Sequence, residues 1–331
     1  MDDATMPTVS VVIPVYRSEH TLAALYQRLT TVLTSCARDY EIVLVEDCGG
    51  DGSWRVIEEL SGTDARVRGY RFTRNFGQHN ALLCGIRAAN HEIVVTLDDD
   101  LQNPPEEIPK LLAKLGEGFD VVYGAPEIEQ HGFLRDKASR ITKLALQNAM
   151  GAQTARHVSA FRAFRMPIRA AFANYRSPLV SIDVLLTWGT TRFTHIFVRH
   201  DPRTVGASNY TVRKLITHAL NLMTGFTTLP LQFASIIGFA FAFFGFLVLA
   251  YVLVNYAIHG GGVPGFPFLA SIVAIFSGVQ LFALGIIGEY LARMHMRTMD
   301  RPPYLIGYQT KTDVSGVPQR MARDLNSIKV R

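Results

Sequence analysis

A long stretch without charged side chains limits how the carboxyl-terminal part of this chain can fold. Between Leu215 and Gly288 the sequence contains no Asp, Glu, Lys or Arg. Within this stretch, Phe233–Ile258 and Phe268–Tyr290 each exceed the roughly 20 apolar residues that span a bilayer as a helix, and a segment rich in Gly separates them. A pair of buried core helices is the alternative, but so long an uncharged run is unusual in a soluble protein. The pattern therefore predicts a two-helix transmembrane hairpin.

Basic residues flank the predicted hairpin on both sides, whereas its connecting loop has none. Arg213 and Lys214 precede the first span, and Arg293, Arg297 and Arg301 follow the second. Because basic residues are enriched on the cytoplasmic side of membrane spans, both flanks are expected in the cytoplasm. The amino-terminal residues show neither the basic nor the apolar region of a signal peptide. We therefore expect a multi-pass protein of the cell (inner) membrane, with its large amino-terminal domain and both termini in the cytoplasm.

Composition also divides the chain into regions. Residues 1–209 have the make-up of a soluble domain, residues 232–292 hold the two spans, and residues 293–331 form a cytosolic tail. Residues 210–231 mix polar with apolar side chains, which predicts an amphipathic helix at the membrane interface. The formal net charge of +5 suits a protein that rests on anionic headgroups. Nucleic acid is not an expected partner, because no basic helix or aromatic platform stands out.

The amino-terminal domain alternates candidate strands with candidate helices. The candidate strands are Val9–Pro14, Glu41–Glu46, Val67–Phe72, Ile93–Leu97 and Asp120–Tyr123. The candidate helices are Leu22–Leu33, Ser53–Leu60, Asn80–Ala89 and Glu106–Leu115. This alternation predicts a doubly wound α/β sheet. A dinucleotide-binding version of that sheet is not expected, because no G-x-G-x-x-G motif follows the first strand.

Three consecutive aspartates follow the fourth candidate strand. Asp98, Asp99 and Asp100 would stand at the edge where open α/β sheets bind ligands, and strand alternation would point Asp98 and Asp100 in one direction with Asp99 turned away. Carboxylates so placed suit Mg²⁺ or Mn²⁺, which commonly binds substrate phosphates as well, so the implied substrate carries a diphosphate. The alternative is a solvated loop in which one aspartate caps the helix that begins near Pro105. Mutual repulsion of three adjacent carboxylates favours the cation.

Several motifs taken together resemble a known family. They are VVIPVYRSE (Val11–Glu19), LVEDCGGDGSW (Leu44–Trp54), RNFGQHNALLCGI (Arg74–Ile86), LDDDLQNPPE (Leu97–Glu106), the pair Arg135 and Ser139, and RTVGASNY (Arg203–Tyr210), followed by two membrane spans. They resemble the membrane-anchored family 2 glycosyltransferases of the polyprenyl-phosphate sugar transferase group, which includes dolichyl-phosphate mannose synthase and bacterial undecaprenyl-phosphate glycosyltransferases. The resemblance covers nearly the whole chain. It implies a GT-A fold, which is a Rossmann-like, doubly wound mixed sheet, followed by the hairpin.

The resemblance also implies which residues form the site. The implied nucleotide-binding residues are Pro14, Tyr16, Glu46, Asp47 and Asp98. The implied ligands of Mg²⁺ or Mn²⁺ are Asp98, Asp100 and Gln102. Arg135 and Ser139 resemble the residues that bind the lipid phosphate, and Arg203, Ser208 and Tyr210 resemble a loop that closes over the donor. The implied catalytic residues are Asp98, Asp100, Arg135 and Arg203.

Alternatives and departures accompany some of these assignments. For Tyr16 a core-packing role is equally open, and Arg135 with Ser139 could be an exposed surface pair. The usual Asp-Asp pair of the family is Glu46-Asp47 in this chain. Ala160 occupies a position where some relatives have an aspartate.

The implied reaction is inverting transfer of a sugar from a nucleotide diphosphate sugar to a polyprenyl phosphate at the bilayer. A uridine diphosphate sugar is the favoured donor, with guanosine diphosphate mannose open. The acceptor is a phosphate monoester with a second pKa near 6, so it is largely ionised at pH 7 and needs no general base.

Two other functions stay open at this stage. One is a polysaccharide or glycolipid synthase with a hydroxyl acceptor, although that chemistry needs a base and no Gln-x-x-Arg-Trp signature of processive synthases is present. The other is a non-catalytic membrane scaffold that retains the fold. Homo-oligomers are a further expectation, because small residues in the spans permit close helix packing. These residues are Gly238, Gly245, Gly278, Gly285 and Gly288.

Overall fold

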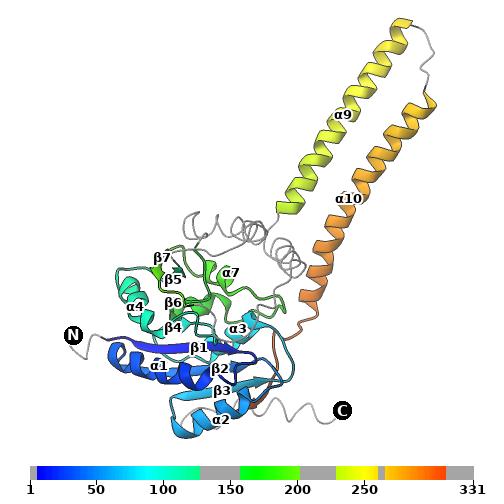
Figure 1. Ribbon diagram of the computed structural model, residues 1–331. Coiled ribbons are helices and arrows are strands. Elements are labelled where there is room, and N and C mark those ends of the chain that lie inside the picture. Colours follow the sequence, from blue (N-terminus) through cyan, green and yellow to red (C-terminus); the bar gives the residue numbers. More distant parts are fainter. Residues whose placement is uncertain (1–5, 127–156, 202–228, 260–264, 311–331) are drawn as a thin grey trace.

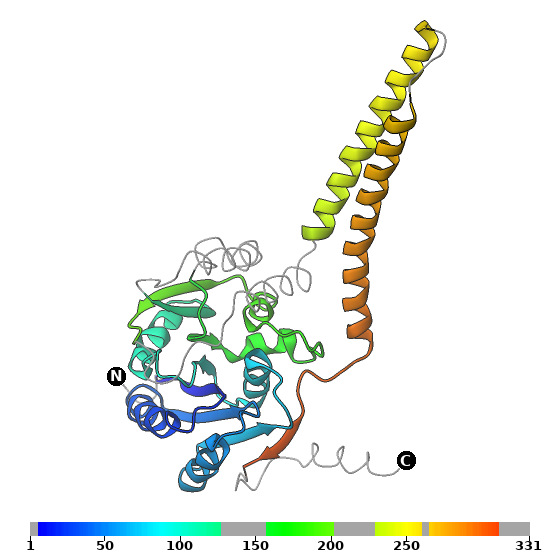
Figure 2. The same cartoon turned by 45° about the vertical axis from the view of Figure 1, so that its right-hand side comes forward.

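The computed structural model describes residues 6–126, 157–201, 229–259 and 265–310 of the 331-residue chain. Within these ranges it consists of an α/β domain from which a long pair of helices projects (Figures 1 and 2).

The α/β domain is built on a mixed sheet whose described part has eight strands in the order β7-β5-β6-β4-β1-β2-β3-β8. The strands are β1 (Thr8–Val15), β2 (Asp39–Glu46), β3 (Val67–Phe72), β4 (Ile93–Thr96), β5 (Val121–Pro126), β6 (Arg162–Arg165), β7 (Phe193–Val198) and β8 (Ile306–Gln309). The neighbours β4, β1, β2 and β3 run parallel, β6 is antiparallel to both β4 and β5, and β8 is antiparallel to β3. The four parallel strands therefore end at one common edge, which is where ligands bind in such sheets.

Helices cover both faces of this sheet. They are α1 (Leu22–Cys36), α2 (Ser53–Thr63), α3 (Gln78–Ala88), α4 (Ile108–Gly116) after the short 3-10 helix η2 (Pro105–Glu107), the 3-10 helix η3 (Met166–Phe172) and α7 (Ile182–Thr187). Alternate residues of β1 serve the two cores: Val11 and Ile13 pack with α1, α2 and α4, whereas Val12 packs with α3 and α7. Such two-sided burial explains the continuous apolar runs of the central strands.

The predicted doubly wound sheet is confirmed, with differences at its ends. All five candidate strands and all four candidate helices are present, although β4 ends at Thr96, one residue earlier than expected. Strands β6, β7 and β8 were not predicted. β6 and β8 have four residues each, and β6 begins and ends with arginine, so neither has the apolar run that marks a central strand.

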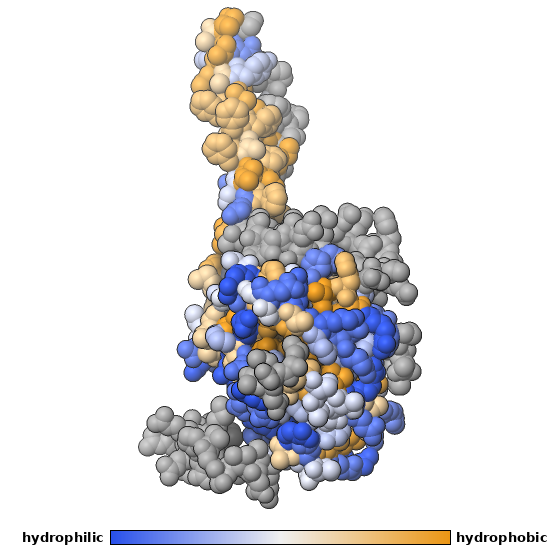
Figure 3. All heavy atoms as spheres, turned by 90° about the vertical axis from the view of Figure 1, so that its left-hand side faces the viewer, coloured by the Kyte–Doolittle hydropathy of each residue, from blue (hydrophilic) through white to orange (hydrophobic). Residues whose placement is uncertain are grey.

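The projecting helices are α9 (Leu229–His259) and α10 (Phe266–Thr298), which lie side by side. By length and composition, Leu231–Ile258 and Ile275–Thr298 are long and apolar enough to cross a membrane. Figure 3 shows hydrophobic side chains along the outside of this hairpin, in contrast to the mixed surface of the domain below it. Gly245 allows close contact between the helices, because a Cβ atom there would lie 2.8 Å from the ring of Phe276.

The chain returns to the sheet after the hairpin. Strand β8 pairs with the edge strand β3, and the Tyr304 ring stacks on Phe72 with centroids 5.2 Å apart. Just beyond β8, the backbone N–H of Gly69 donates to the Thr310 hydroxyl at 2.9 Å. Part of the segment expected as a tail is therefore ordered: α10 continues to Thr298, and residues 306–309 belong to the sheet.

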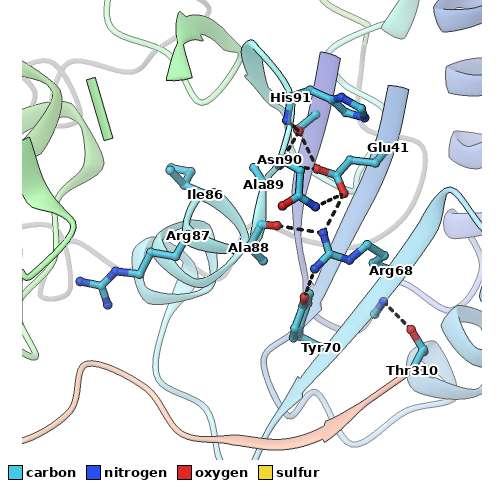
Figure 4. A network of polar contacts seen from close by, with 12 residues as sticks. Glu41, Arg68, Tyr70, Ile86, Arg87, Ala88, Ala89, Asn90, His91 and Thr310 are labelled. Carbon is cyan, nitrogen blue, oxygen red and sulfur yellow. Dashed lines mark hydrogen bonds and ion pairs between the residues drawn. The ribbon is translucent and has the colours of Figure 1, made fainter. Parts of the chain in front are cut away.

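A buried polar network closes the sheet at the opposite edge from the ligand-binding one (Figure 4). The Glu41 carboxylate accepts hydrogen bonds from the Ser10 hydroxyl at 2.7 Å and from the Asn90 backbone N–H at 2.6 Å, and it pairs with Arg68 at 2.8 Å. Arg68 also donates to the Ala88 carbonyl at 2.9 Å, at the end of α3. Because carbonyls at a helix end lack partners within the helix, this guanidinium fixes the position of α3 against the sheet.

Candidate active site

Loops from three adjacent strands meet at the carboxyl edge of the sheet. β1 lies between β4 and β2, so the residues after Val15, Glu46 and Thr96 come together. The loop after β1 is tied to the loop after β2, because the Ser18 backbone N–H donates to the Ser53 hydroxyl at 2.9 Å. The strand order, more than any single residue, creates this site.

The three aspartates occupy a turn after β4 and have different neighbours. Asp98 accepts a hydrogen bond from the side-chain amide of Gln78 at 2.6 Å, whereas Asp99 accepts one from the Tyr16 backbone N–H at 2.9 Å and another from the Ser18 hydroxyl. Asp98 and Asp99 therefore contact different neighbours. Strand alternation is not the cause, because β4 has ended and the chain is already turning. That Asp98 and Asp100 point in one direction stays a prediction.

Negative charge is concentrated in this turn. Burial, followed by the neighbouring carboxylates of Asp100 and Asp99, raises the pKa of Asp98 to about 7. Burial also raises the pKa of Asp99 to about 6, against the effect of its hydrogen bonds from Ser18 and Tyr16. The positive charge of Arg162 and the Gln78 hydrogen bond act in the opposite direction on Asp98. Positive charge brought to this turn would therefore be strongly stabilised.

The donor set fits a divalent cation with few protein ligands. Asp98 and Asp100 supply carboxylates and Gln102 supplies an amide oxygen, which are the oxygen ligands that Mg²⁺ and Mn²⁺ accept. Among the described residues, no group of three or more His, Cys, Asp or Glu side chains is placed to hold a metal ion. A cation at this turn would thus need further ligands from water or from a substrate phosphate.

Gln102 connects this turn to a later part of the chain. Its backbone N–H donates to the Asp100 carboxylate at 3.1 Å, which closes the turn. Its carbonyl accepts from the Asp201 backbone N–H at 2.9 Å. Asp201, two residues before Arg203 in the sequence, therefore lies beside the turn that carries the aspartates.

The acidic pair after β2 is buried and already bonded. Glu46 accepts from the Gly49 backbone N–H at 2.6 Å and pairs with Arg71 at 3.0 Å. Asp47 accepts from the backbone N–H groups of Phe76 and Gly77 at 2.6 and 2.8 Å. Burial, which outweighs these two hydrogen bonds, raises the pKa of Asp47. In this structure both carboxylates order the loops around the site, and their contact with a nucleotide stays a prediction.

Asp47 also determines how α3 begins. Gly77 has a φ of 96°, a left-handed conformation that glycine adopts without strain, and it immediately precedes α3. This bend lets two successive N–H groups reach one carboxylate. It also places Gln78, the first residue of α3, beside Asp98.

The loop after β1 presents one aromatic and one basic side chain. Pro14 is buried within β1, opposite Val45, so its side chain has a packing role in this structure. Tyr16 is 41% exposed. Arg17, with a φ of 58°, lies over the Tyr16 ring and donates from Nε to the Gly49 carbonyl at 3.0 Å. Arg17 therefore joins the loop after β1 to the loop after β2, the two loops expected to bind the nucleotide.

Sequence reasoning missed a buried charged cluster next to the aspartates. Arg162 of β6, only 2% exposed, makes a very short contact with the Asp183 carboxylate, which also accepts from the Tyr123 hydroxyl at 3.0 Å. The carbonyl of Ala160 accepts from the Thr96 hydroxyl at 2.7 Å. Arg162 directly follows the Ala160-Phe161 pair, so an arginine between the apolar residues Phe161 and Ala163 was the available signal.

The lipid-phosphate and lid assignments lie outside the described residues. These assignments involve Arg135, Ser139, Arg203, Ser208 and Tyr210. They remain predictions, as does the interfacial helix expected over residues 210–231, of which only residues 229–231 are described, as the start of α9.

A mixed sheet in this order, with an acidic turn after its fourth strand, defines a glycosyltransferase of the GT-A type. The chain belongs to glycosyl transferase family 2, whose profile matches residues 10–179. The resemblance noted in the sequence is thereby confirmed.

Curated relatives match over most of the chain. The undecaprenyl-phosphate 4-deoxy-4-formamido-L-arabinose transferase of Shewanella sediminis is 35% identical over 311 residues, covering 92% of this chain and 94% of the relative. The enzyme of the same name from Proteus mirabilis is 36% identical over 301 residues, covering 90% and 92%.

A solved structure supports the fold alone. It is glucosyl-3-phosphoglycerate synthase from Mycobacterium tuberculosis, crystallised with Mn²⁺ and UDP-glucose. Its similarity has a TM-score of 0.50 at 17% identity and covers 67% of this chain and 78% of the other.

Proposed function

We propose that this protein is a membrane-bound transferase that moves a sugar from a nucleotide diphosphate sugar to a polyprenyl phosphate. The observation that carries the proposal is the length of the match to relatives that are named for an undecaprenyl-phosphate acceptor. An alignment that covers 92% of this chain leaves too few residues unmatched to omit either apolar helix or the catalytic domain. The acceptor of those relatives is a lipid, and this chain carries the hairpin that would bring its site to a bilayer.

The donor would bind across the loops after β1, β2 and β4. Tyr16 and Arg17 would contact the donor from the loop after β1, and Glu46 and Asp47 would order the neighbouring loops that complete its site. A divalent cation held by Asp98, Asp100 and Gln102 would supply positive charge to the donor's diphosphate. We favour a uridine diphosphate sugar, in line with the UDP-glucose bound by the mycobacterial enzyme of this fold.

Transfer would be a single inverting displacement. An oxygen of the lipid phosphate forms a bond to the anomeric carbon while the bond from that carbon to the diphosphate breaks, and the nucleoside diphosphate leaves. The attacking phosphate is ionised at neutral pH, so the absence of a carboxylate at Ala160 is compatible with this step. Arg135 and Ser139 would hold the acceptor phosphate in line, and Arg203 would stabilise charge on the leaving group.

Membrane attachment would determine where in the cell the reaction takes place. With α9 and α10 inserted, the site would lie on the cytoplasmic side of the inner membrane, where the basic residues that flank the hairpin face anionic headgroups. A lipid acceptor cannot leave the bilayer, so an enzyme fixed to its surface meets it by diffusion in two dimensions.

The test is a panel of radiolabelled nucleotide sugars offered to the purified full-length protein in detergent with Mg²⁺ or Mn²⁺ and undecaprenyl or dolichyl phosphate. Organic extraction separates labelled lipid from unreacted donor. Metal-dependent label in the organic phase from one donor would support the proposal and name that donor. No label from any donor, with nucleotide binding intact, would contradict it.

A further inference from the structure

Two hydrogen bonds join the loop after β1 to the turn that carries the aspartates. The backbone N–H of Tyr16 donates to Oδ2 of Asp99 at 2.9 Å, and the Ser18 hydroxyl donates to the same oxygen. Tyr16 directly follows the last residue of β1, so its N–H has left the strand ladder and needs a partner elsewhere. Asp99 therefore holds the beginning of this loop by its backbone and again, two residues later, by a side chain.

Ser18 also ties the same loop to the loop after β2. Its backbone N–H donates to the Ser53 hydroxyl at 2.9 Å, and the Ser53 hydroxyl donates in turn to the Asp51 carboxylate at 2.8 Å. Asp51 accepts a further hydrogen bond from the Glu19 backbone N–H at 3.2 Å. Ser18 therefore lies where the loops after β1, β2 and β4 meet, and its hydroxyl makes the connection to the third of them.

The backbone is strained on both sides of the link between Ser18 and Asp99. Arg17 has a φ of 58° and Leu101 a φ of 62°, in the left-handed region that residues other than glycine rarely adopt. Such conformations persist only where the surrounding contacts hold them. Arg17 lies between Tyr16 and Ser18, and Leu101 lies two residues after Asp99. The bonds to Asp99 are therefore among the contacts that keep both segments in place.

Asp99 is not a proposed ligand of the cation, but it lies between two of them in the sequence. A cation held by Asp98 and Asp100 would restrict the peptide units on either side of Asp99. It would also offset the repulsion that the neighbouring charges exert on the Asp99 carboxylate. Both effects favour the arrangement in which Asp99 holds Tyr16 and Ser18, so cation binding would stabilise the loop that is proposed to contact the nucleotide.

We infer that Ser18 and Asp99 couple the cation site to the nucleoside site, as positioning residues that contact neither the cation nor the reacting atoms. This coupling rests on the proposed function, from which it takes the cation at Asp98 and Asp100 and the nucleotide at Tyr16. Cation binding orders the loop after β1 through Asp99, and the nucleoside part of the donor then binds more tightly. By linkage, a bound nucleoside tightens cation binding by the same factor.

A nucleoside without phosphate separates this coupling from direct contact between cation and donor. The diphosphate of an intact donor would contact the cation itself, whereas any effect of the cation on a nucleoside passes through the protein. Labelled uridine and labelled guanosine are each dialysed to equilibrium against the full-length protein in detergent, with Mg²⁺ or with EDTA. We expect Mg²⁺ to lower the Kd of one of them about fivefold, at the lower end of the usual range for coupled sites.

Matched variants assign the coupling to these two side chains. Ser18→Ala removes one of the two bonds and should reduce the Mg²⁺ effect to about twofold, whereas Asp99→Ala removes both bonds and should abolish it. Asp99→Asn keeps an accepting oxygen without the charge and should retain part of the effect. Ser61→Ala is the control, because the Ser61 hydroxyl donates to the Glu58 carbonyl within α2. A purely structural loss would weaken nucleoside binding equally in Mg²⁺ and in EDTA, and the ratio of the two Kd values would stay as in the parent.

The remaining outcomes distinguish this coupling from the proposed function. A nucleoside Kd that Mg²⁺ leaves unchanged in the parent protein, or a parent that binds neither nucleoside, would overturn the coupling while radiolabel transfer, measured in parallel, still supports the reaction. A Mg²⁺ effect of parental size in Ser18→Ala would overturn it as well, and this milder variant decides if Asp99→Ala does not fold. Binding of UDP and GDP that does not depend on Mg²⁺, together with absent transfer, would remove the proposed cation site and the coupling at once.

Discussion

At the scale of single residues, the carboxylates of the turn after β4 are the proposed cation ligands. Replacement of Asp100 by alanine is expected to abolish sugar transfer while membrane insertion and folding remain largely intact, because Asp100 is a proposed cation ligand on a partly exposed turn. Radiolabel transfer measures the effect, and flotation with vesicles checks insertion. Asp39→Ala, at the far end of β2, is the matched control. Near-normal turnover by the Asp100 variant would refute the metal assignment.

Gln78 gives a second prediction at this scale, as the hydrogen-bond donor that holds Asp98. A hydrogen bond to a charged group contributes about 1.5–3 kcal/mol, so Gln78→Leu should lower transfer roughly 10- to 100-fold. The half-saturating Mn²⁺ concentration should rise as well, because Asp98 loses its orientation. Gln27→Leu makes the same change at an exposed position of α1 and should leave both quantities as they are. An unchanged Mn²⁺ titration for Gln78→Leu would show that this contact has no part in the site.

At the scale of elements, the polar network around Glu41 and Arg68 holds α3 and the strands in register. It lies at the edge of the sheet opposite the ligand-binding edge. Glu41→Gln should lower the free energy of unfolding by about 2–3 kcal/mol, because it leaves the half-buried Arg68 without its counter-charge. Transfer per folded molecule should stay near normal, since the network lies at the opposite edge from the site. Chemical unfolding in detergent measures the free energy of unfolding, and Glu58→Gln at an exposed position of α2 is the control.

The same network predicts a pH dependence. Burial raises the pKa of Glu41, but hydrogen bonds from Ser10, Arg68 and Asn90 outweigh it, so the pKa lies below the ordinary value of 4.5. A lowered pKa in the folded state means that the stabilisation is complete above the ordinary value and is lost as pH falls through the folded value. The difference in unfolding free energy between Glu41→Gln and the parent should therefore be constant near neutrality and shrink below pH 4.5. A difference that grows on acidification would contradict this assignment.

Elements with a clear pattern of apolar residues were predictable from the sequence. Contacts that form only in the assembled sheet were not. The apolar runs of β1 and β4 and the aspartates after β4 marked the parallel core and its ligand edge. Strand β8 was missed because its four residues gain their partners only when the chain returns from the membrane helices to β3. The link between Gln78 and Asp98 was missed for the same reason, since residues 20 positions apart meet only once α3 has packed.

At the scale of the whole molecule, β8 connects the hairpin to the catalytic domain. Tyr304→Ala removes the ring stacked on Phe72 and should lower the free energy of unfolding by about 2 kcal/mol, less than the 3–5 kcal/mol typical of a fully buried aromatic residue. Tyr308 lies on β8 and is 65% exposed, so Tyr308→Ala should have little effect. Equal losses in the two variants, measured by thermal unfolding, would show that the stack has no special part in holding β8.

In the proposed reaction a sugar passes to the phosphate of a polyprenyl lipid. The most direct test is the mass of the lipid product that the full-length protein forms from undecaprenyl phosphate and the donor found in the panel, with Mn²⁺ and with EDTA. We predict a metal-dependent lipid product that has gained one sugar and still contains a single phosphorus atom, with one nucleoside diphosphate released for each sugar transferred. A lipid with two phosphorus atoms, or release of nucleoside diphosphate while the lipid mass stays unchanged, would contradict it.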